Sequence, residues 1–206
     1  MYTTNLANKI QVEMIKQGYV EIEASARHVH LCKDDLMTLF GMTDLEEVRE
    51  LSQPGQYLSG QKLILQGPKR KIERVSVLGP LREKTQVEIS KSDAIQLGVD
   101  CPIRESGDIK DSGKITLIGP KGQIELGEGV IIAHNHIHVT PYEAKLLNLK
   151  DKEIVSVKVM SVRPVTFDDV VVRIDYNFAF RMHVDFDEAN AAAVQGFTLG
   201  KIIKRN

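Results

Sequence analysis

The 206-residue sequence has no tryptophan, and its aromatic residues make up only 5% of the chain. Proteins that bind single-stranded nucleic acid stack its bases on aromatic side chains, so this scarcity argues against such a surface. The formal net charge is −1, which provides no overall attraction to nucleic acid or to an anionic membrane. We therefore expect no nucleic acid and no membrane among the partners, and any anion site has to be local.

Cysteine is also scarce, with only Cys32 and Cys101. The two form no CxxC motif and no larger framework, which favours a reduced, cytoplasmic setting. The chain has no apolar run of about 18 residues for a membrane span and no segment of the signal-peptide type. Its content of 42% hydrophobic and 27% charged residues is typical of a globular protein with one large domain or two small ones.

Short runs typical of β-strands fill most of the chain, separated by Gly, Pro, Asn and Asp. The segment 62–69 (KLILQGPK) resembles 114–121 (KITLIGPK), so a hairpin-like unit is expected twice. Many short strands with regular turns favour barrels or sandwiches over a parallel sheet. Before these runs, residues 5–17 carry a thin apolar stripe that predicts a short amphipathic helix ending at Gly18.

Four segments share one layout that joins a strand to a helix. Each has a ligand-type residue at the strand end, then an apolar residue, a helix cap and, three residues after the cap, an acid. An acid at that place can accept a hydrogen bond from the cap, so four short helices are expected just after four strand ends. The segments are His30–Asp35, Glu88–Asp93, His138–Glu143 and His183–Glu188.

A plain strand–helix connector would explain the caps and the acids of this layout. Ser90, Thr140 and Asp185 are good N-cap residues, and only Cys32 is a poor one. A connector would not explain why the residue two before each cap is His, Glu, His and His. The layout therefore also indicates a site.

All the histidines of the chain lie in these segments or just upstream of them. Residues two apart on a strand point to the same side, so His28 and His30 share a face, as do His134, His136 and His138. Neutral imidazole together with carboxylate is a zinc ligand set, although ligand type alone leaves iron and manganese open. The histidines and Glu88 exceed the four ligands of one tetrahedral ion, so we expect two metal ions, each able to keep a position open for substrate.

An arginine lies close to this ligand set in the sequence. Arg82 precedes Glu88 by six residues, and its planar fork can bind a phosphate with two hydrogen bonds. The alternative is a surface arginine in a turn. Lys69, Arg70 and Lys71 form a basic cluster that is either a solvated face or a contact for the phosphates of a nucleotide-like ligand.

The segment 25–31 (SARHVHL) resembles the S-x-R-H-[IV]-H-L motif of the PduL-type phosphate propanoyltransferases. The resemblance continues in order from about residue 20 to about residue 192. Further matching segments are QPGQY (53–57), LGPLR (78–82), QVEIS (86–90), HIHV (136–139) and MHVDFDEANAA (182–192).

The resemblance implies a mainly β fold of two closely packed β-barrels with short capping α-helices. The first barrel would be discontinuous, with residues 20–26 plus 135–206, and the second would take residues 27–134, after an N-terminal helix or tail of residues 1–19. It also implies two zinc ions at the junction of the barrels, where coenzyme A and phosphate would bind.

By the same resemblance, one zinc would be held by His28 and His30. The other would be held by Glu88, His136, His138 and His183. Arg82 would bind phosphate and act in catalysis, and Lys69, Arg70 and Lys71 are then the candidates for contacts with coenzyme A.

Two residues depart from the family pattern. Asn135, preceded by the extra His134, stands where the family usually has Arg. Cys32 stands where the family usually has Ser, which brings a thiol near the site. The sequence does not assign a role to these three residues.

The function that follows is a phosphate acyltransferase. It would interconvert a short-chain acyl-CoA (propionyl- or acetyl-CoA) plus phosphate with an acyl phosphate plus CoA, by direct attack of phosphate. The first alternative is a metal-dependent hydrolase of thioesters or phosphoesters with water as the nucleophile. The second is a barrel that is stabilised by metal ions in closed four-ligand sites and serves as a scaffold. The surplus of candidate ligands and the nearby Arg82 argue against this alternative.

The expected location is cytoplasmic, with the interior of a bacterial microcompartment as one such setting. Residues 1–18 are interpreted either as a loosely docked terminal helix or as a docking peptide for shell or core proteins of such a compartment. The acyl length, the physiological direction and whether the protein is a homo-oligomer stay open.

Overall fold

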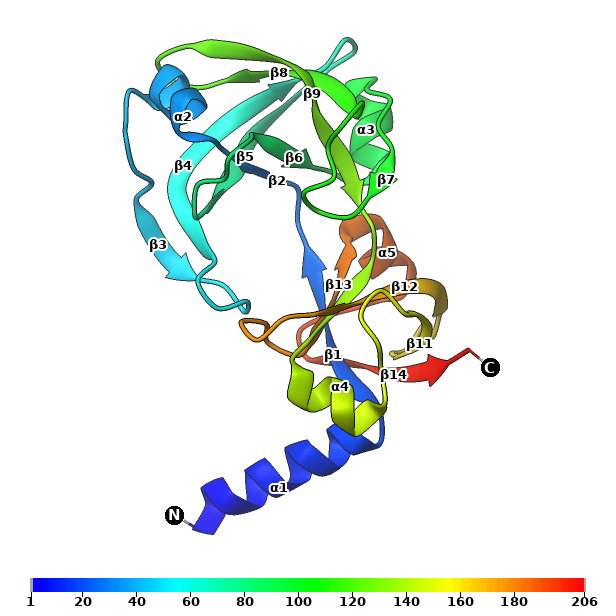
Figure 1. The fold of residues 1–206 in the computed structure, drawn as a ribbon. Helices are drawn as coiled ribbons and strands as arrows, with labels where there is room; N and C mark the ends of the chain where they lie inside the picture. The colour runs from blue at the N-terminus through cyan, green and yellow to red at the C-terminus, as the bar shows by residue number, and fades with distance from the viewer. Residues whose placement is uncertain (1, 206) are drawn as a thin grey trace. The chain divides into compact units, whose positions relative to one another are not determined.

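The computed structural model describes residues 2–205, with side chains from Leu6 onward. Two compact units make up the chain (Figure 1). Unit 1 takes the described residues up to Ser25, then Asn135–Val184, then the residues from Glu188 onward. Unit 2 takes Ala26–His134 together with Asp185–Asp187. Each unit has its own hydrophobic core, so each is described separately.

Unit 2 contains a closed ring of six strands in the order β2-β5-β4-β8-β9-β6. These strands are β2 (His28–His30), β4 (Tyr57–Gln66), β5 (Lys71–Gly79), β6 (Gln86–Glu88), β8 (Gly113–Ile118) and β9 (Gln123–Ala133). Two short strands, β3 (Glu47–Glu50) and β7 (Ile103–Arg104), pair outside the ring, with β4 and β9 respectively. The helices are α2 (Lys33–Phe40) and α3 (Lys91–Leu97).

Unit 1 is also a closed six-stranded barrel, in the order β1-β13-β10-β12-β11-β14. Its strands are β1 (Tyr19–Ser25), β10 (His136–Val139), β11 (Ile154–Met160), β12 (Thr166–Ile174), β13 (Arg181–Asp185) and β14 (Thr198–Lys204). The helices are α1 (Tyr2–Lys16), α4 (Pro141–Leu147) and α5 (Phe186–Ala191). The expectation of a mainly β chain with two barrels and short helices is confirmed.

The two barrels place their His-x-His strands in the same surroundings. In unit 2, β2 pairs in parallel with β5 on one side and antiparallel with β6 on the other. In unit 1, β10 pairs in parallel with β12 and antiparallel with β13. The residue opposite the first histidine is Glu88 in one barrel and His183 in the other. The two candidate ligand sets are therefore built on one plan.

The repeated segment forms two hairpins, as the sequence predicts. Strands β4 and β8 pair with each other so that Leu65 lies opposite Leu117, its equivalent in the repeat. Each hairpin turn closes on a helix end, because Lys69 N donates to Leu97 O and Lys121 N to Leu39 O, both at 3.0 Å. A Cβ at Gly67 would lie 2.2 Å from Leu97 O, so this close approach requires glycine.

All four helices expected from the repeated layout are present, and their caps differ in detail. Ser90 with Asp93 and Thr140 with Glu143 form the expected capping boxes. Cys32 makes no side-chain cap bond. Instead its backbone N donates to Oγ1 of Thr85 (3.0 Å), and that hydroxyl donates to the carboxylate of Asp35. Thr85, the residue just before β6, thus completes the weakest of the caps.

Helix α1 begins three residues earlier than the sequence predicts, and it contacts α4 and β1 of unit 1. Ile15 is buried, whereas Leu6 and Ile10 on the expected apolar stripe are 55% and 53% exposed. Most of the stripe therefore faces solvent.

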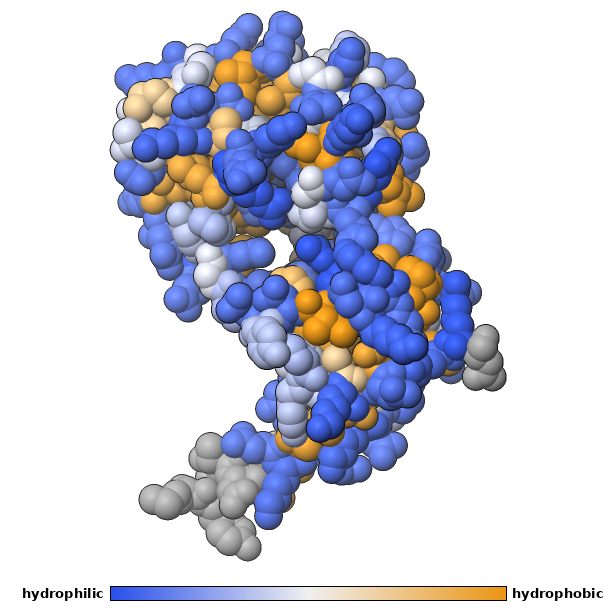
Figure 2. All heavy atoms as spheres, in the orientation of Figure 1, coloured by the Kyte–Doolittle hydropathy of each residue, from blue (hydrophilic) through white to orange (hydrophobic). Residues whose placement is uncertain are grey.

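No helix among residues 2–205 combines the length and the apolar character that a membrane span needs. In the view of Figure 2, hydrophilic atoms cover most of each unit, with smaller apolar areas between them.

Candidate metal and anion site

The first ligand group lies in unit 2 and consists of His28, His30 and Glu88. The antiparallel register of β2 and β6 places Glu88 opposite His28. All three residues contribute ligand atoms that lie within 4.8 Å of one another, and all three are largely buried. The resemblance assigned Glu88 to the other metal ion, whereas the structure groups its carboxylate with His28 and His30.

A hydrogen bond to the backbone orients the ring of His28. Nδ1 of His28 lies 2.8 Å from the carbonyl oxygen of Ala26, which can only accept, so Nδ1 carries the proton and donates. In the neutral ring Nε2 then keeps its lone pair, and it lies 3.5 Å from Oε2 of Glu88. A backbone carbonyl that fixes the tautomer of a histidine is a common support of metal ligation.

Arg82 reaches this group from the loop after β5. Its backbone N donates to Leu31 O (2.9 Å), which places the side chain beside His30. Nη2 lies 2.8 Å from Nε2 of His30, and Nη1 donates to Oγ of Ser106 (3.0 Å). The arginine predicted to bind an anion is therefore in direct contact with a candidate metal ligand.

Burial and charge set the protonation of the group. Burial lowers the pKa of His30 to about 2, with the neighbouring His28 and Arg82 adding to the effect, so the ring is neutral and able to ligate. Burial alone would raise the pKa of Glu88. The histidines, the Ser106 hydroxyl and Arg82 outweigh it and lower that pKa to about 2, so the carboxylate is ionised.

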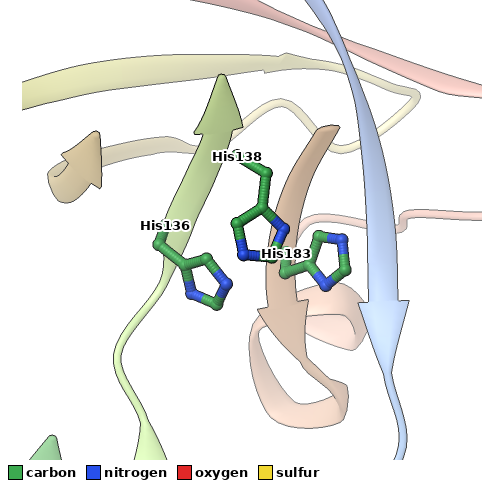
Figure 3. A group of neighbouring side chains, drawn as sticks. All are labelled: His136, His138 and His183. Carbon is green, nitrogen blue, oxygen red and sulfur yellow. The ribbon is translucent and has the colours of Figure 1, made fainter. Parts of the chain in front are cut away.

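The second group lies in unit 1 and consists of His136, His138 and His183. His136 and His138 project from the same face of β10, and His183 comes from β13, where it lies opposite His136 (Figure 3). The ring centroids are 4.6 Å apart for His136 and His138, 4.9 Å for His138 and His183, and 5.4 Å for His136 and His183. The strands thus gather three imidazoles in one place.

His138 is the most enclosed of these three rings. Phe178 packs against it with the centroids 4.1 Å apart, and Nδ1 of His138 is buried with no hydrogen-bond partner among the described residues. Burial, then the nearby His136 and His183, lower its pKa to about 2. A buried, neutral and unpaired ring nitrogen beside two further imidazoles fits a divalent metal such as zinc.

Other residues singled out in the sequence lie outside both groups. His134 shares no group with the other histidines, and its backbone N donates to Arg104 O. Asn135 donates through Nδ2 to Oε1 of Glu188 (2.9 Å), so it binds the acid of the fourth repeated segment. Cys32 is a free thiol at the start of α2.

The basic cluster Lys69, Arg70 and Lys71 is exposed at the turn between β4 and β5. The backbone of this turn contacts the last residue of α3, and α3 begins three residues after Glu88. The cluster therefore belongs to the same barrel as the first ligand group. The side-chain stem of Lys69 lies against Gly98 at the end of α3, and nothing in the geometry assigns the cluster a ligand.

Two residues of the site were missed by the sequence analysis. Nε2 of Gln86 donates to Oε1 of Glu88 (2.6 Å), and Oγ of Ser106 donates to the same oxygen (2.7 Å). Gln86 has a sequence signal, since it lies two residues before Glu88 and therefore on the same face of the strand. Ser106 lies in a loop 18 residues after Glu88, and no local pattern marks it.

Comparisons with known proteins identify the family of the chain. The family model described as phosphate propanoyltransferase matches residues 21–195. A phosphate propanoyltransferase of Clostridioides difficile is 47% identical over 206 residues, which cover 98% of this chain and 99% of the relative. Those of Listeria monocytogenes (46% identical, 98% and 95% covered) and Thermotoga maritima (48% identical, 92% and 91% covered) are similarly close. The chain belongs to the phosphate propanoyltransferase family.

Proposed function

We propose that this protein is a phosphate acyltransferase that interconverts a short-chain acyl-CoA plus phosphate with an acyl phosphate plus CoA. Family membership over nearly the whole chain supports the reaction class. The observation that carries the assignment to this site is the contact of Arg82 with the group of His28, His30 and Glu88. An anion-binding fork and a metal-ligand set in direct contact are what phosphate transfer to an activated acyl group needs.

The two ligand groups would hold one zinc ion each. His28, His30 and Glu88 would hold one, and His136, His138 and His183 the other. Three protein ligands leave a tetrahedral ion one open position, which is typical of catalytic rather than structural zinc. When bound, zinc would supply Lewis acidity toward the thioester carbonyl and a soft partner for the leaving thiolate.

The chain's own residues would bind and orient the phosphate. Arg82 offers several N–H groups in one plane, and a phosphate can take two of them at once. Glu88 is ionised and His30 is neutral at neutral pH, so neither side chain changes its protonation state near pH 7. A phosphate oxygen would then attack the thioester carbon, the C–S bond would break, and CoA would leave as the thiolate, without an acyl-enzyme.

The experiment that tests this proposal is a coupled assay of metal-quantified protein with acetyl-, propionyl- and butyryl-CoA, each with and without phosphate. A transferase releases CoA only when phosphate or arsenate is present. Of the alternatives, a metal-dependent thioester hydrolase predicts the same rate of CoA release without phosphate, and a phosphoester hydrolase predicts no release of CoA with or without it. Phosphate-independent release would overturn the proposal, and the three substrates would rank the acyl length.

Two further parts of the proposal concern partners. Lys69, Arg70 and Lys71 are exposed and carry three positive charges, which suits contacts with the phosphates of coenzyme A.

The exposed stripe of α1 (Leu6 and Ile10) would dock on shell or core proteins of a bacterial microcompartment. An amphipathic helix needs an apolar groove on its partner, and this stripe is left uncovered by unit 1 itself.

A further inference from the structure

A buried glutamine makes three hydrogen bonds beside the first ligand group. Gln86 is 1% exposed and lies on β6 opposite His30. Its Nε2 donates to Oε1 of Glu88 (2.6 Å) and to Oγ of Ser106 (3.0 Å). Its Oε1 accepts from the backbone N of Gly107 (2.8 Å). Both ends of the amide are thus in use.

The bond from Gly107 fixes which way the amide points. A backbone N–H can only donate, so the end of the amide that faces Gly107 has to be the oxygen. The nitrogen end is therefore directed at Glu88 and Ser106. Because both ends have partners, turning the amide over would leave a buried donor facing a donor, which is costly.

These bonds give the two carboxylate oxygens of Glu88 different surroundings. Oε1 accepts from Gln86 and from Ser106 (2.6 and 2.7 Å) and is saturated with donors. Oε2 lies 3.5 Å from Nε2 of His28, on the side of the candidate ligands. Ser106 also accepts from Nη1 of Arg82, so the same hydroxyl contacts both the carboxylate and the phosphate-binding arginine.

The other barrel shows that this position on the strand need not hold an amide. Arg181 occupies the equivalent place on β13, opposite His138. It pairs with Glu21 at 2.5 Å and Glu23 at 3.7 Å on β1. In that barrel the third ligand is a histidine, which has no second oxygen to hold. The amide is found where the third ligand is a carboxylate.

We propose that Gln86 is a positioning residue that holds Oε1 of Glu88, with Ser106, so that Oε2 alone is presented to the metal bound by His28 and His30. This inference rests on the proposed function, because it requires that the group bind a transition metal. Partners of this kind orient ligands, and their loss typically weakens metal binding about 10- to 100-fold.

The test is a zinc titration of the folded protein in competition with a chromophoric chelator, for the wild type, Gln86→Met and Gln61→Met. Gln61 is the matched control, since it is a buried glutamine of the same barrel that bonds Glu46 N and Met42 Sδ and does not contact Glu88. We expect Gln86→Met to bind one of two zinc ions about 10- to 100-fold more weakly. Gln61→Met should bind both as the wild type does.

The weakened ion is identified by repeating the titration in a His138→Ala background, which leaves the group beside Gln86 as the remaining site. Wild-type zinc affinity in Gln86→Met would overturn the positioning role and leave the proposed function intact. A wild-type protein that binds no tight zinc would overturn both. If Gln86→Met does not fold, Ser106→Ala tests the same carboxylate from the loop, and unchanged zinc affinity there would also overturn the inference.

Discussion

Arg82 donates through Nη2 to Nε2 of His30, at 2.8 Å. A guanidinium cannot accept a hydrogen bond, so it engages the lone pair of that nitrogen. The same lone pair cannot bind a metal at the same time. Metal ligation through Nε2 would therefore release Nη2 of Arg82, which would then be available to an incoming phosphate.

From this contact we predict that Arg82→Lys affects phosphate more than coenzyme A. An ammonium is a point charge and cannot reproduce a two-bond fork. The KM for phosphate should rise about tenfold or more, while the KM for acyl-CoA changes less and the bound metal is retained. Steady-state kinetics with each substrate varied in turn would measure this. Equal changes in both KM values would count against the assignment.

We predict about two zinc ions per chain. His138→Ala should lose the ion of unit 1, and Glu88→Gln should weaken the ion of unit 2, because each removes one of three ligands. Both should also lower the melting temperature, since bound metal stabilises the folded state. His134→Ala is the control, as this histidine lies in neither group, and it should keep both ions. Elemental analysis that finds no stoichiometric transition metal in active protein would contradict the prediction.

The buried histidines predict a pH dependence of stability. The pKa of His30 and of His138 is lowered to about 2 in the folded protein, whereas an unfolded histidine has about 6.5. Below about pH 6.5 the unfolded chain binds more protons, so metal-free protein should lose stability as the pH falls. The loss is at most about 1.4 kcal/mol per pH unit for each ring.

Urea unfolding of chelator-treated protein at pH 7.5, 6.5 and 5.5 would measure this dependence. The variant His138→Gln should show a shallower slope, because one of the two titrating rings is gone. A free energy of unfolding that does not change over this range would show that these rings do not control acid stability.

We predict that Cys32→Ser keeps most activity. Cys32 lies at the N-cap of α2, where its backbone N bonds to Thr85, and its thiol makes no cap bond. Serine is the better N-cap, so the free energy of unfolding of the variant should be higher by up to about 1 kcal/mol. Initial-rate plots should intersect, as expected for a ternary complex. An inactive variant with its metal intact, together with an acylated Cys32 in mass spectra of the wild type, would instead establish an acyl-enzyme.

The exposed stripe of α1 predicts a role in targeting that is separate from catalysis. Replacing both Leu6 and Ile10 by Glu should leave activity unchanged and abolish recruitment of a reporter fused to residues 1–18. Alanine at Lys9 and Gln11, which are exposed on the same helix, is the control and should still be recruited. If a reporter fused to the native residues 1–18 stays diffuse in cells that make microcompartments, the targeting prediction is wrong.

Much of the fold follows from short-range patterns in the sequence. Alternating residues place His136 and His138 on one face of a strand, and the cap at Thr140 with its acid Glu143 sets the start of α4. These features depend on neighbours within four residues, so the sequence contains them. The same reasoning found the helix at Cys32, although its cap is completed by Thr85, 53 residues away.

The grouping of the ligands could not be obtained in the same way. Glu88 meets His28 because of the register between β6 and β2, which is set by the packing of the whole barrel. Ser106 reaches Glu88 from a loop whose path depends on that barrel. The candidate ligands could therefore be named from the sequence, whereas their grouping and their partners depend on contacts that are distant in the sequence.

The order of strands around the unit 1 barrel has a consequence for synthesis on the ribosome. Strand β1 pairs with β13 and β14, which follow it by more than 150 residues, and the six ring strands of unit 2 are all translated in between. A nascent chain can therefore complete the ring of unit 2 while β1 still has two unpaired edges. At about 5 to 20 residues per second, this strand waits roughly 10 to 30 seconds for its partners, and during that time it needs protection from pairing with other chains.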